Sequence, residues 1–470
     1  MKKRRRPNRL KENVLLLDMA AEGRCVARID EKVYFVSGGV PGDRVDLLVE
    51  KDKKSFAEAR VYRLLEPSAD RIPAFCSHFG TCGGCKWQNL SYERQLELKT
   101  KQVKDAFERI GKITEGVWHP ILPSEETQFY RNKLEFTFSD QRWLEEKDND
   151  IEMREGMNGL GFHIPGRFDK ILDVKKCYLQ AEPSNSIRLW VKDYCEKNGL
   201  SFFNLREQTG LLRNLMIRTT GIGQVMVLLI VTEFNKEVSD LLENLSESIP
   251  GIDSLQYLVN TKRNDAYSEL QAVVFKGNAW VEEEMDGLKF RVGPTSFYQT
   301  NGRQASRLYQ KVAEFAGVQS TDLVYDLYTG TGTIAQYIAR KAGFVIGVEY
   351  VEAAVKDAVS NAANNGIANT RFISGDMAKI LTPDFEKDNG RPRIIVTDPP
   401  RAGMHPSVVA SILEIGPEVI VYVSCNPATQ ARDIALMMDA YNVCEIQPID
   451  MFPHTHHVEN IVILKNKKYL

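Results

Sequence analysis

A cysteine that follows an apolar run is the residue of this chain best suited to chemistry. Residues 419–424 have the composition of a buried strand, Cys425 comes next, and a helix-forming segment begins after Asn426 and Pro427. A thiol beside a helix N-terminus meets the positive end of the helix dipole, which favours the nucleophilic thiolate. Free cysteine is also one of the most frequently buried residue types. Taken alone, Cys425 therefore fits a core position at least as well as a catalytic one.

The C-terminal third that contains Cys425 alternates apolar runs with helical patterns. The predicted elements are strands at 323–327, 344–349, 393–397 and 419–424, and helices at 333–341, 351–365, 406–415 and 428–440. This alternation is typical of a doubly wound α/β domain, in which ligands bind at the carboxyl ends of the strands. The residues suited to binding or catalysis fall at those ends.

A glycine-rich loop follows the first of these strands. It contains Gly330 and Gly332 but lacks the third glycine of a dinucleotide loop, and no Gly-Lys-Ser/Thr run follows. Glu349 comes 23 residues after Asp326, at the end of the next strand, where a carboxylate can accept hydrogen bonds from ribose hydroxyls. Together with Asp376, these acids suit a cationic ligand better than a phosphate. S-adenosylmethionine, which carries a sulfonium and an amino group, meets that requirement.

Five ordered motifs resemble one enzyme family. They are Ser296-Phe-Tyr-Gln-Thr-Asn301, Asp326-Leu-Tyr-Thr-Gly-Thr-Gly-Thr333, Asp398-Pro-Pro-Arg401, Ser424-Cys-Asn-Pro427 and His457-Val-Glu459. These motifs resemble those of the RNA 5-methyluridine methyltransferases, in particular the iron–sulfur-containing bacterial 23S rRNA uracil-5-methyltransferases. Together with the N-terminal half, the resemblance spans nearly the whole chain. Thr329 departs from the cysteine that many relatives carry in the glycine-rich loop. Because threonine is also small and polar, we still expect cofactor binding.

The resemblance implies a covalent mechanism. Carbon 5 of uracil is a poor nucleophile, and attack of a thiolate on carbon 6 turns the ring into an enolate that can take a methyl group. Cys425 is implied as this nucleophile, and Glu459 as the base that removes the proton from carbon 5. Glu459 precedes a predicted strand at 461–464, so we expect burial to raise its pKa towards the range useful for a base.

The resemblance also assigns residues around the substrates. Phe297 is expected near a flipped-out base, where an aromatic face is useful. Arg401 stands where methyltransferases that act on amino groups carry an aromatic residue, which disfavours that chemistry. The implied cofactor contacts are Gln299, Tyr328, Glu349, Asp376 and Asp398.

Three cysteines form a second motif, Cys-x5-Cys-x2-Cys, at Cys76, Cys82 and Cys85. No signal peptide or transmembrane run is evident, so we expect a reducing, cytoplasmic location without disulfides or a membrane partner. From the residues alone, zinc and an iron–sulfur cluster fit equally, although zinc ribbons usually carry two Cys-x2-Cys pairs. The resemblance adds Cys177 as the fourth ligand of a 4Fe–4S cluster, with a structural or RNA-positioning role.

The N-terminal region predicts a tail and a small barrel. Residues 1–12 are expected to form a flexible tail, which contains seven basic residues. Because the whole chain has a net charge of −2, the remainder of the chain is clearly acidic. Such a tail binds phosphates or serves solubility alone. Strand-like runs at 13–17, 33–36 and 44–49 predict a five-stranded OB-type barrel over 13–66. Gly39-Val-Pro-Gly-Asp-Arg-Val45 in it resembles the RNA-binding TRAM domain.

Two further domains follow in the prediction. Residues 67–290 are expected to form a central α+β domain with the cysteine loop and RNA contacts, and residues 291–470 the catalytic domain. An amphipathic helix at 91–110, closed by Gly111, has an apolar stripe of Leu96, Val103, Phe107 and Ile110. Arg131 and Lys133 fit RNA contacts and surface ion pairs equally well.

The sequence thus predicts methylation of carbon 5 of a uridine in structured RNA by a monomeric enzyme that uses S-adenosylmethionine. We expect 23S rRNA before tRNA, because relatives that modify tRNA often lack both barrel and cluster. An RNA-binding assembly protein with a vestigial methyltransferase domain is the alternative of another class. It is disfavoured by the retention of Gln299, Glu349, Asp398, Cys425 and Glu459.

Overall fold

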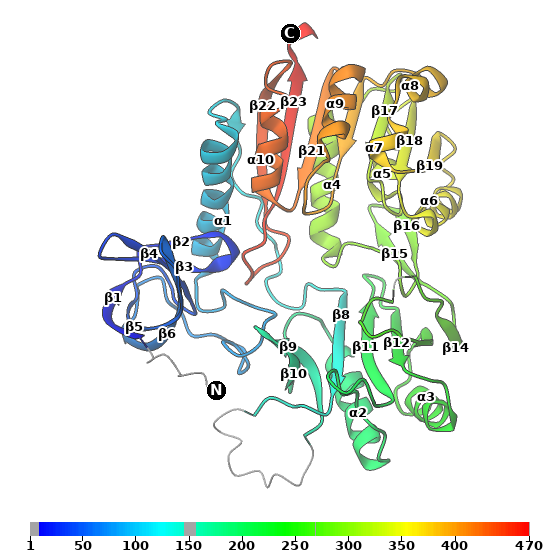
Figure 1. Ribbon diagram of the computed structural model, residues 1–470. Coiled ribbons are helices and arrows are strands. Elements are labelled where there is room, and N and C mark those ends of the chain that lie inside the picture. The colour runs from blue at the N-terminus through cyan, green and yellow to red at the C-terminus, as the bar shows by residue number, and fades with distance from the viewer. Residues whose placement is uncertain (1–8, 145–156, 268, 470) are drawn as a thin grey trace.

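The structure is a computed structural model that describes residues 9–144, 157–267 and 269–469. These residues form three bodies: a barrel (blue in Figure 1), a sheet with two helices (cyan and green), and a larger α/β body (mostly yellow to red). The predicted tail lies outside the described residues up to residue 8. Residues 9–12 belong to the first strand, so that part of the tail prediction is wrong.

The barrel has six strands in its described part, in the order β1-β5-β6-β4-β3-β2. This is one strand more than predicted. The first strand ends before Leu16, whose N–H donates to the Asp43 carbonyl, and the chain then forms the separate strand β2, which pairs with β3. Small and branched side chains such as Ala27 and Val45 fill the interior. The elements are β1 (Arg9–Leu15), β2 (Asp18–Met19), η1 (Ala21–Gly23), β3 (Cys25–Ile29), β4 (Lys32–Ser37), β5 (Arg44–Asp52) and β6 (Phe56–Glu66).

The central body is a seven-stranded sheet in the order β10-β9-β8-β11-β12-β13-β14. Its strands β11 and β12 are buried on both faces, which explains the uninterrupted apolar run of β12. Helices α2 (Ser184–Lys197) and α3 (Lys236–Ser248) pack on one face. The strands are β8 (Lys133–Ser139), β9 (Gly159–Ile164), β10 (Arg167–Asp173), β11 (Leu212–Thr219), β12 (Val225–Val231), β13 (Ser254–Val259) and β14 (Val273–Gly277).

The third body is built on an eight-stranded sheet in the order β19-β18-β17-β20-β21-β23-β22-β7. Five parallel strands are followed in the chain by the antiparallel pair β22 and β23, which confirms the predicted doubly wound arrangement. The strands are β17 (Leu323–Leu327), β18 (Phe344–Glu349), β19 (Thr370–Ser374), β20 (Ile394–Thr397), β21 (Val419–Ser424), β22 (Tyr441–Ile449) and β23 (Glu459–Asn466), with β7 (Val117–Trp118) at the edge.

Helices cover both faces of this sheet, and two separate apolar cores result. A hairpin of β15 (Val281–Met285) and β16 (Leu288–Val292) joins one of these cores, so this body begins before the predicted boundary at residue 291. The helices are α4 (Gly302–Ala316), α5 (Thr333–Ala339), α6 (Glu352–Asn364), α7 (Met377–Ile380), α8 (Pro383–Asn389), α9 (Pro406–Ile415), α10 (Pro427–Ala435) and η4 (Lys467–Tyr469). None of the described helices combines the length and the apolarity needed to cross a bilayer.

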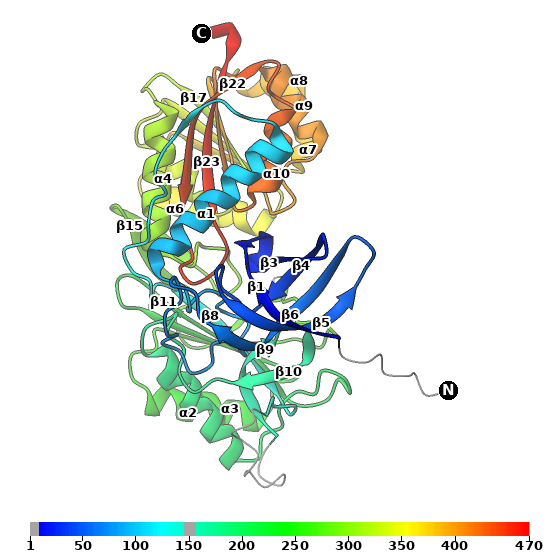
Figure 2. The same cartoon turned by 90° about the vertical axis from the view of Figure 1, so that its left-hand side faces the viewer.

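Helix α1 (Tyr92–Ala106) packs on this third body although the sequence assigned it to the central domain (Figure 2). It continues as a π-helical turn, η2 (Phe107–Gly111), which leaves Ile110 49% exposed and makes the predicted apolar stripe partly wrong. The buried face of α1 instead carries two polar residues among its apolar ones: Gln95, Leu98, Lys99, Val103 and Ala106.

Candidate active site

The two predicted catalytic residues lie at one edge of the eight-stranded sheet. Cys425 follows β21 directly, and Glu459 is the first residue of β23, not a loop residue before the strand. Because β23 runs antiparallel to β21 and pairs Asn460 with Ser424, its N-terminal end lies at the carboxyl end of β21. Asp398 follows β20, the next strand. The thiol and the two carboxyl groups are close enough to influence one another's ionisation.

The Cys425 thiol is not the thiolate that the helix dipole alone predicts. Helix α10 does begin here, with Asn426 accepting a hydrogen bond from the Ala428 N–H at 3.1 Å. Burial, together with the negative charges of Glu459 and Asp398, nevertheless raises the pKa of Cys425 to about 11, and the Arg401 guanidinium only partly opposes this. Desolvation therefore outweighs the dipole. The raised pKa favours the protonated thiol over the thiolate in the free protein.

Three carboxyl groups at this edge are harder to ionise than ordinary ones. Burial raises the pKa of Asp398 to about 7, and burial with the charges of Asp398 and Glu349 raises that of Asp326 to about 7. The pKa of Glu459 lies well above its usual range, first because of burial and then because of Asp398. This bears out the direction expected for Glu459. Close like charges keep part of the set protonated, and a bound cation would favour the ionised forms.

The glycine-rich loop is hydrogen-bonded to two acidic residues, Asp326 and Glu349. Glu349, at the end of β18, accepts hydrogen bonds from the Gly330 N–H at 3.0 Å and the Val351 N–H at 2.9 Å. The Thr329 hydroxyl donates to Asp326 Oδ2 at 2.5 Å, so the unusual loop residue supports the carboxylate beside it. Asp326 Oδ1 is buried and has no hydrogen-bond partner among the described residues. A donor from a ligand, such as an amino group, fits that oxygen.

Two further predicted cofactor contacts border this loop. Tyr328 directly follows β17 with a φ of 64°, a left-handed conformation that is unusual for a residue with a side chain, and burial raises its pKa to about 12. Asp376 follows β19 and caps α7 by accepting from the Ala378 N–H at 3.0 Å. Both residues thus lie at carboxyl ends of parallel strands, as predicted.

The segment that contains Gln299 is held by the central body. Asn132 donates its side-chain N–H to the Gln299 carbonyl at 3.0 Å and its backbone N–H to the Thr300 carbonyl at 2.7 Å. Phe297, in the same segment, is 70% exposed and can meet a base. Sequence reasoning missed Asn132, although it stands between the two basic residues singled out in that motif.

A second residue missed from the sequence is Tyr309 of α4. Its buried phenol lies among the acids, and burial with the charges of Asp398, Asp326 and Glu459 raises its pKa well above the usual range. The phenol therefore stays neutral beside the carboxyl groups. No local pattern marks it, because Tyr309 belongs to the ordinary apolar face of an amphipathic helix.

Arg401 is the cation that faces the thiol. Its guanidinium approaches His457 Nδ1 at 3.5 Å, and its carbonyl accepts from the Asn426 side-chain N–H at 2.9 Å. Burial lowers the pKa of His457 to about 3 and that of His456 to about 4, so both imidazoles are neutral. Positive charge beside Cys425 thus comes from Arg401.

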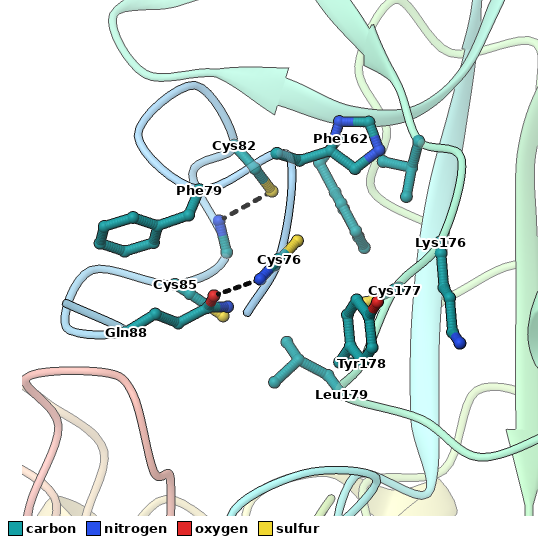
Figure 3. Close-up of a pocket in the computed structure, with 13 residues that line it drawn as sticks. Cys76, Phe79, Cys82, Cys85, Gln88, Phe162, Lys176, Cys177, Tyr178 and Leu179 are labelled. Atoms are coloured by element: carbon teal, nitrogen blue, oxygen red, sulfur yellow. Dashed lines mark hydrogen bonds between the residues drawn. The ribbon is translucent and has the colours of Figure 1, made fainter. Parts of the chain in front are cut away.

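The four cysteines of the second predicted site line a single cavity of about 30 Å³ (Figure 3). Cys76, Cys82 and Cys85 come from the loop before α1, and Cys177 comes from the segment after β10 on the other side. The Gly84 N–H donates to Cys82 Sγ at 3.4 Å. All four are free thiols.

The thiols of this cavity influence one another. Burial raises the pKa of Cys82 to about 12 and that of Cys85 to about 11, with further contributions from neighbouring cysteines of the set. Within the described ranges, no group of three or more His, Cys, Asp or Glu side chains forms a site for a metal ion.

Arg131 and Lys133, the proposed RNA contacts, are only partly exposed. The Arg131 guanidinium lies 5.1 Å from the centre of the Phe452 ring, and burial lowers the pKa of Lys133. Arg131 therefore also packs against the segment that leads to Glu459.

Two parts of the chain match known protein families, and nearly its whole length is similar to known RNA methyltransferases. Residues 9–62 match the TRAM domain, and residues 266–467 match the tRNA (uracil-5-)-methyltransferase family. An uncharacterised RNA methyltransferase of Porphyromonas gingivalis is 51% identical over 96% of this chain and 98% of its own length, and one of Bacteroides thetaiotaomicron is 52% identical over 95% and 100%.

A solved structure is also similar. The tRNA (uracil-54, C5)-methyltransferase of Pyrococcus abyssi, in complex with S-adenosyl-L-homocysteine, is 27% identical with a TM-score of 0.74, covering 96% of this chain and 99% of that one. The two relatives are RNA methyltransferases, and the family match over residues 266–467 and the solved structure are both of uracil-5-methyltransferases. The chain therefore belongs to the family of RNA uracil-5-methyltransferases.

Proposed function

We propose that this protein transfers a methyl group from S-adenosylmethionine to carbon 5 of a uridine in structured RNA. The observation that carries the proposal is the meeting of Cys425 and Glu459 at one edge of the sheet, with Arg401 beside the thiol. The unpartnered Asp326 Oδ1 nearby suits the amino group of the cofactor. The similar archaeal structure holds S-adenosyl-L-homocysteine, which supports the same cofactor here.

The residues of the site suggest how the chain performs this reaction. When bound, S-adenosylmethionine supplies the methyl group. Cys425 gives its proton to solvent, and the charge of Arg401 favours the resulting thiolate. Sγ then forms a bond to carbon 6, and the electrons of the carbon 5–carbon 6 double bond move into the ring as an enolate, which makes carbon 5 nucleophilic. After carbon 5 is methylated, Glu459 takes its proton. The electron pair left behind restores the ring double bond, and Cys425 leaves as a thiolate.

The experiment that tests this function uses methyl-labelled S-adenosylmethionine with separate unmodified 23S rRNA and tRNA transcripts. The label should appear in 5-methyluridine with the wild-type protein and be absent with Cys425→Ala. Methyl transfer by Cys425→Ala, or label in another nucleoside, would contradict the proposal. RNA binding without transfer by wild-type protein that binds the cofactor would favour the assembly-protein alternative.

We propose 23S rRNA as the substrate, because the cysteine motif resembles that of the iron–sulfur-containing rRNA enzymes of this family. The barrel does not discriminate, since the match to the archaeal tRNA enzyme covers 96% of this chain and includes it. The specific support for tRNA is the archaeal tRNA enzyme, whose similarity covers 96% of this chain. The same labelling experiment decides between them. Label in tRNA alone would replace the first substrate by the second.

We further propose that Cys76, Cys82, Cys85 and Cys177 hold a 4Fe–4S cluster. The support is that four cysteines from two segments line one cavity, although among the described residues they do not form a metal site as they stand. Because the pKa values of Cys82 and Cys85 are raised, the protons of these two thiols should leave only when positive ions enter, so binding should release protons. A reducing compartment, for which we propose the cytoplasm, would keep the thiols available.

Anaerobic purification followed by iron, acid-labile sulfide and zinc determination tests the cluster. We expect equal amounts of iron and sulfide and their loss in Cys82→Ser. One zinc per chain, without sulfide, would assign the four cysteines to zinc instead.

A further inference from the structure

The segment 450–458 connects β22 to Glu459 and is held mainly from outside its own sheet. Asp450 begins it and is fully buried together with Lys99 of α1, whose Nζ donates to Asp450 Oδ1 at 2.5 Å and to the Phe452 carbonyl at 3.0 Å. The Tyr92 hydroxyl donates to Asp450 Oδ2 at 2.9 Å. A buried ion pair of this kind contributes little net stability but fixes the geometry of the chains that carry it.

The middle of the segment is held in a strained conformation. His454 has a φ of 63°, a conformation that persists in a residue with a side chain only where its surroundings impose it. Its N–H donates to Gln95 Oε1 at 2.8 Å, and its carbonyl accepts from the N–H groups of Lys86 at 2.8 Å and Trp87 at 3.1 Å. Lys86 directly follows Cys85. The backbone of His454 is thus held by α1 and by the cysteine loop.

Gln95 links these two supports. It is fully buried and also donates from Nε2 to the Trp87 carbonyl at 2.9 Å and the Leu90 carbonyl at 3.0 Å. Its amide therefore joins the cysteine loop to the segment on the way to Glu459. A leucine of similar size would fill the same space without making any of these hydrogen bonds.

The central body and the start of α4 hold the same segment at two more points. The Tyr130 hydroxyl of the central body donates to the Pro453 carbonyl at 3.0 Å, and the Asn301 side chain before α4 donates to the Met451 carbonyl at 3.0 Å.

Cys425 lies between β21 and α10, and these two elements also contact the residue after Glu459: Ser424 pairs with Asn460, and Gln430 of α10 donates to the Asn460 carbonyl at 3.0 Å. The thiol and the carboxyl group thus share β21 and α10 on one side, and the segment 450–458 adds supports on the N-terminal side of Glu459 only.

We propose that α1 and the cysteine loop position Glu459 through this segment, so that Gln95 and Lys99 are positioning residues for removal of the carbon 5 proton. The inference rests on the proposed function, in which Glu459 is the base. It gives the cysteine site a role in the reaction that involves no electron transfer. Loosening the segment should slow release of the covalent RNA adduct but leave its formation unchanged.

Two variants test the proposal: Gln95→Leu, and the double variant Lys99→Met with Asp450→Asn, which removes both charges together. With uridine RNA, each should lower turnover by about 10- to 100-fold, as expected for a misplaced catalytic group. Each should also accumulate a covalent protein–RNA complex, visible as a retarded band on a denaturing gel. 5-Fluorouridine RNA carries fluorine instead of hydrogen at carbon 5, so no proton can be removed there and the covalent complex is not released. With this RNA, both variants should form the complex at the wild-type rate.

The controls separate positioning from damage to the fold. Glu459→Gln should accumulate the complex as a reference. Arg213→Met removes a buried cation of the central body, bound to the Asn260 and Lys262 carbonyls, and should destabilise the protein without accumulation. Thermal unfolding and iron content are measured for every variant.

Two results would overturn the inference. An unchanged ratio of complex to product in both variants would show that Glu459 is positioned independently. Equal losses of complex formation and turnover would show that the segment only maintains the fold. If wild-type protein forms no complex with 5-fluorouridine RNA, the proposed function itself fails and the inference with it.

Discussion

The active-site edge and the cysteine cavity both bury thiols, and both raise their pKa values. The pKa of Cys425 is raised to about 11, that of Cys82 to about 12 and that of Cys85 to about 11. What distinguishes the two sites is their neighbours. Cys425 has two carboxyl groups and the Arg401 guanidinium around it, whereas the cavity thiols face mainly one another. A raised pKa therefore does not distinguish the proposed nucleophile from the proposed ligands, whereas the charges beside each thiol do.

The largest expected effect would separate the two kinds of cysteine directly. Cys425→Ala should lower methyl transfer by at least about 10⁴-fold, because it removes the group proposed to add to carbon 6. Iron content and thermal unfolding should stay as in the wild type. Single-turnover transfer and metal analysis on the same preparation measure both. Loss of iron in this variant would break the comparison.

The cavity should show the converse behaviour. Cys82→Ser should lose most of its iron and unfold at a lower temperature, because metal binding and folding are coupled. Cys444→Ser, which changes a half-buried thiol of β22 outside both sites, is the matched control and should keep iron and stability. A Cys82→Ser protein of wild-type stability and RNA affinity would refute the structural role.

The contribution of Arg401 can be measured from the pH dependence of adduct formation. Its positive charge lowers the pKa of Cys425, so Arg401→Met should raise that pKa further and move the rise of the rate with 5-fluorouridine RNA to higher pH. If the pKa of the thiol rises by about one, the thiolate fraction at neutral pH falls about tenfold, and the rate should fall with it. Arg401→Lys keeps the charge and should stay near the wild-type profile. Identical profiles for all three proteins would assign activation of the thiol to another group.

The smallest effect concerns the cofactor loop. Thr329→Val removes the hydroxyl that lowers the pKa of Asp326, so that pKa should rise above about 7. Binding of cationic S-adenosylmethionine should weaken about fivefold at neutral pH, as expected for one hydrogen bond. Wild-type affinity should increase as the pH rises through 7, because Asp326 ionises there. Calorimetry with S-adenosylhomocysteine, which lacks the sulfonium charge, should show a weaker pH dependence, and Thr329→Ser should behave as the wild type.

The sequence was sufficient where local signals decide the structure. The strands at 323–327, 344–349 and 419–424 and the helix at 406–415 have the predicted bounds, because apolar runs mark the strands, and Pro406 and Gly416 bound the helix. It failed for the buried face of α1, where hydrophobicity favoured Leu96 and Ile110 over Gln95 and Lys99. The partner of Lys99 is 351 residues away, so no local pattern could reveal it.

The candidate site was predictable to a similar degree. Cys425, Asp398 and Glu459 could be placed at one edge, because strand ends and motifs locate them. The ionisation of Cys425 could not be predicted, because the burial and the carboxylates that decide it come from other strands. The joint cavity of Cys177 and the loop cysteines needed the resemblance, since 92 residues separate Cys177 from Cys85.

The position of β23 has a consequence for biosynthesis. This strand follows β22 in the chain but lies between β21 and β22 in the sheet, so the sheet is completed from its interior. Because a chain emerges from the ribosome with its N-terminal part first, Cys425 is present before Glu459. Because β21 gains its second neighbour only when β23 inserts, the edge that carries Cys425 and the proposed base is completed in one late step, and a chain that lacks Glu459 has no finished site.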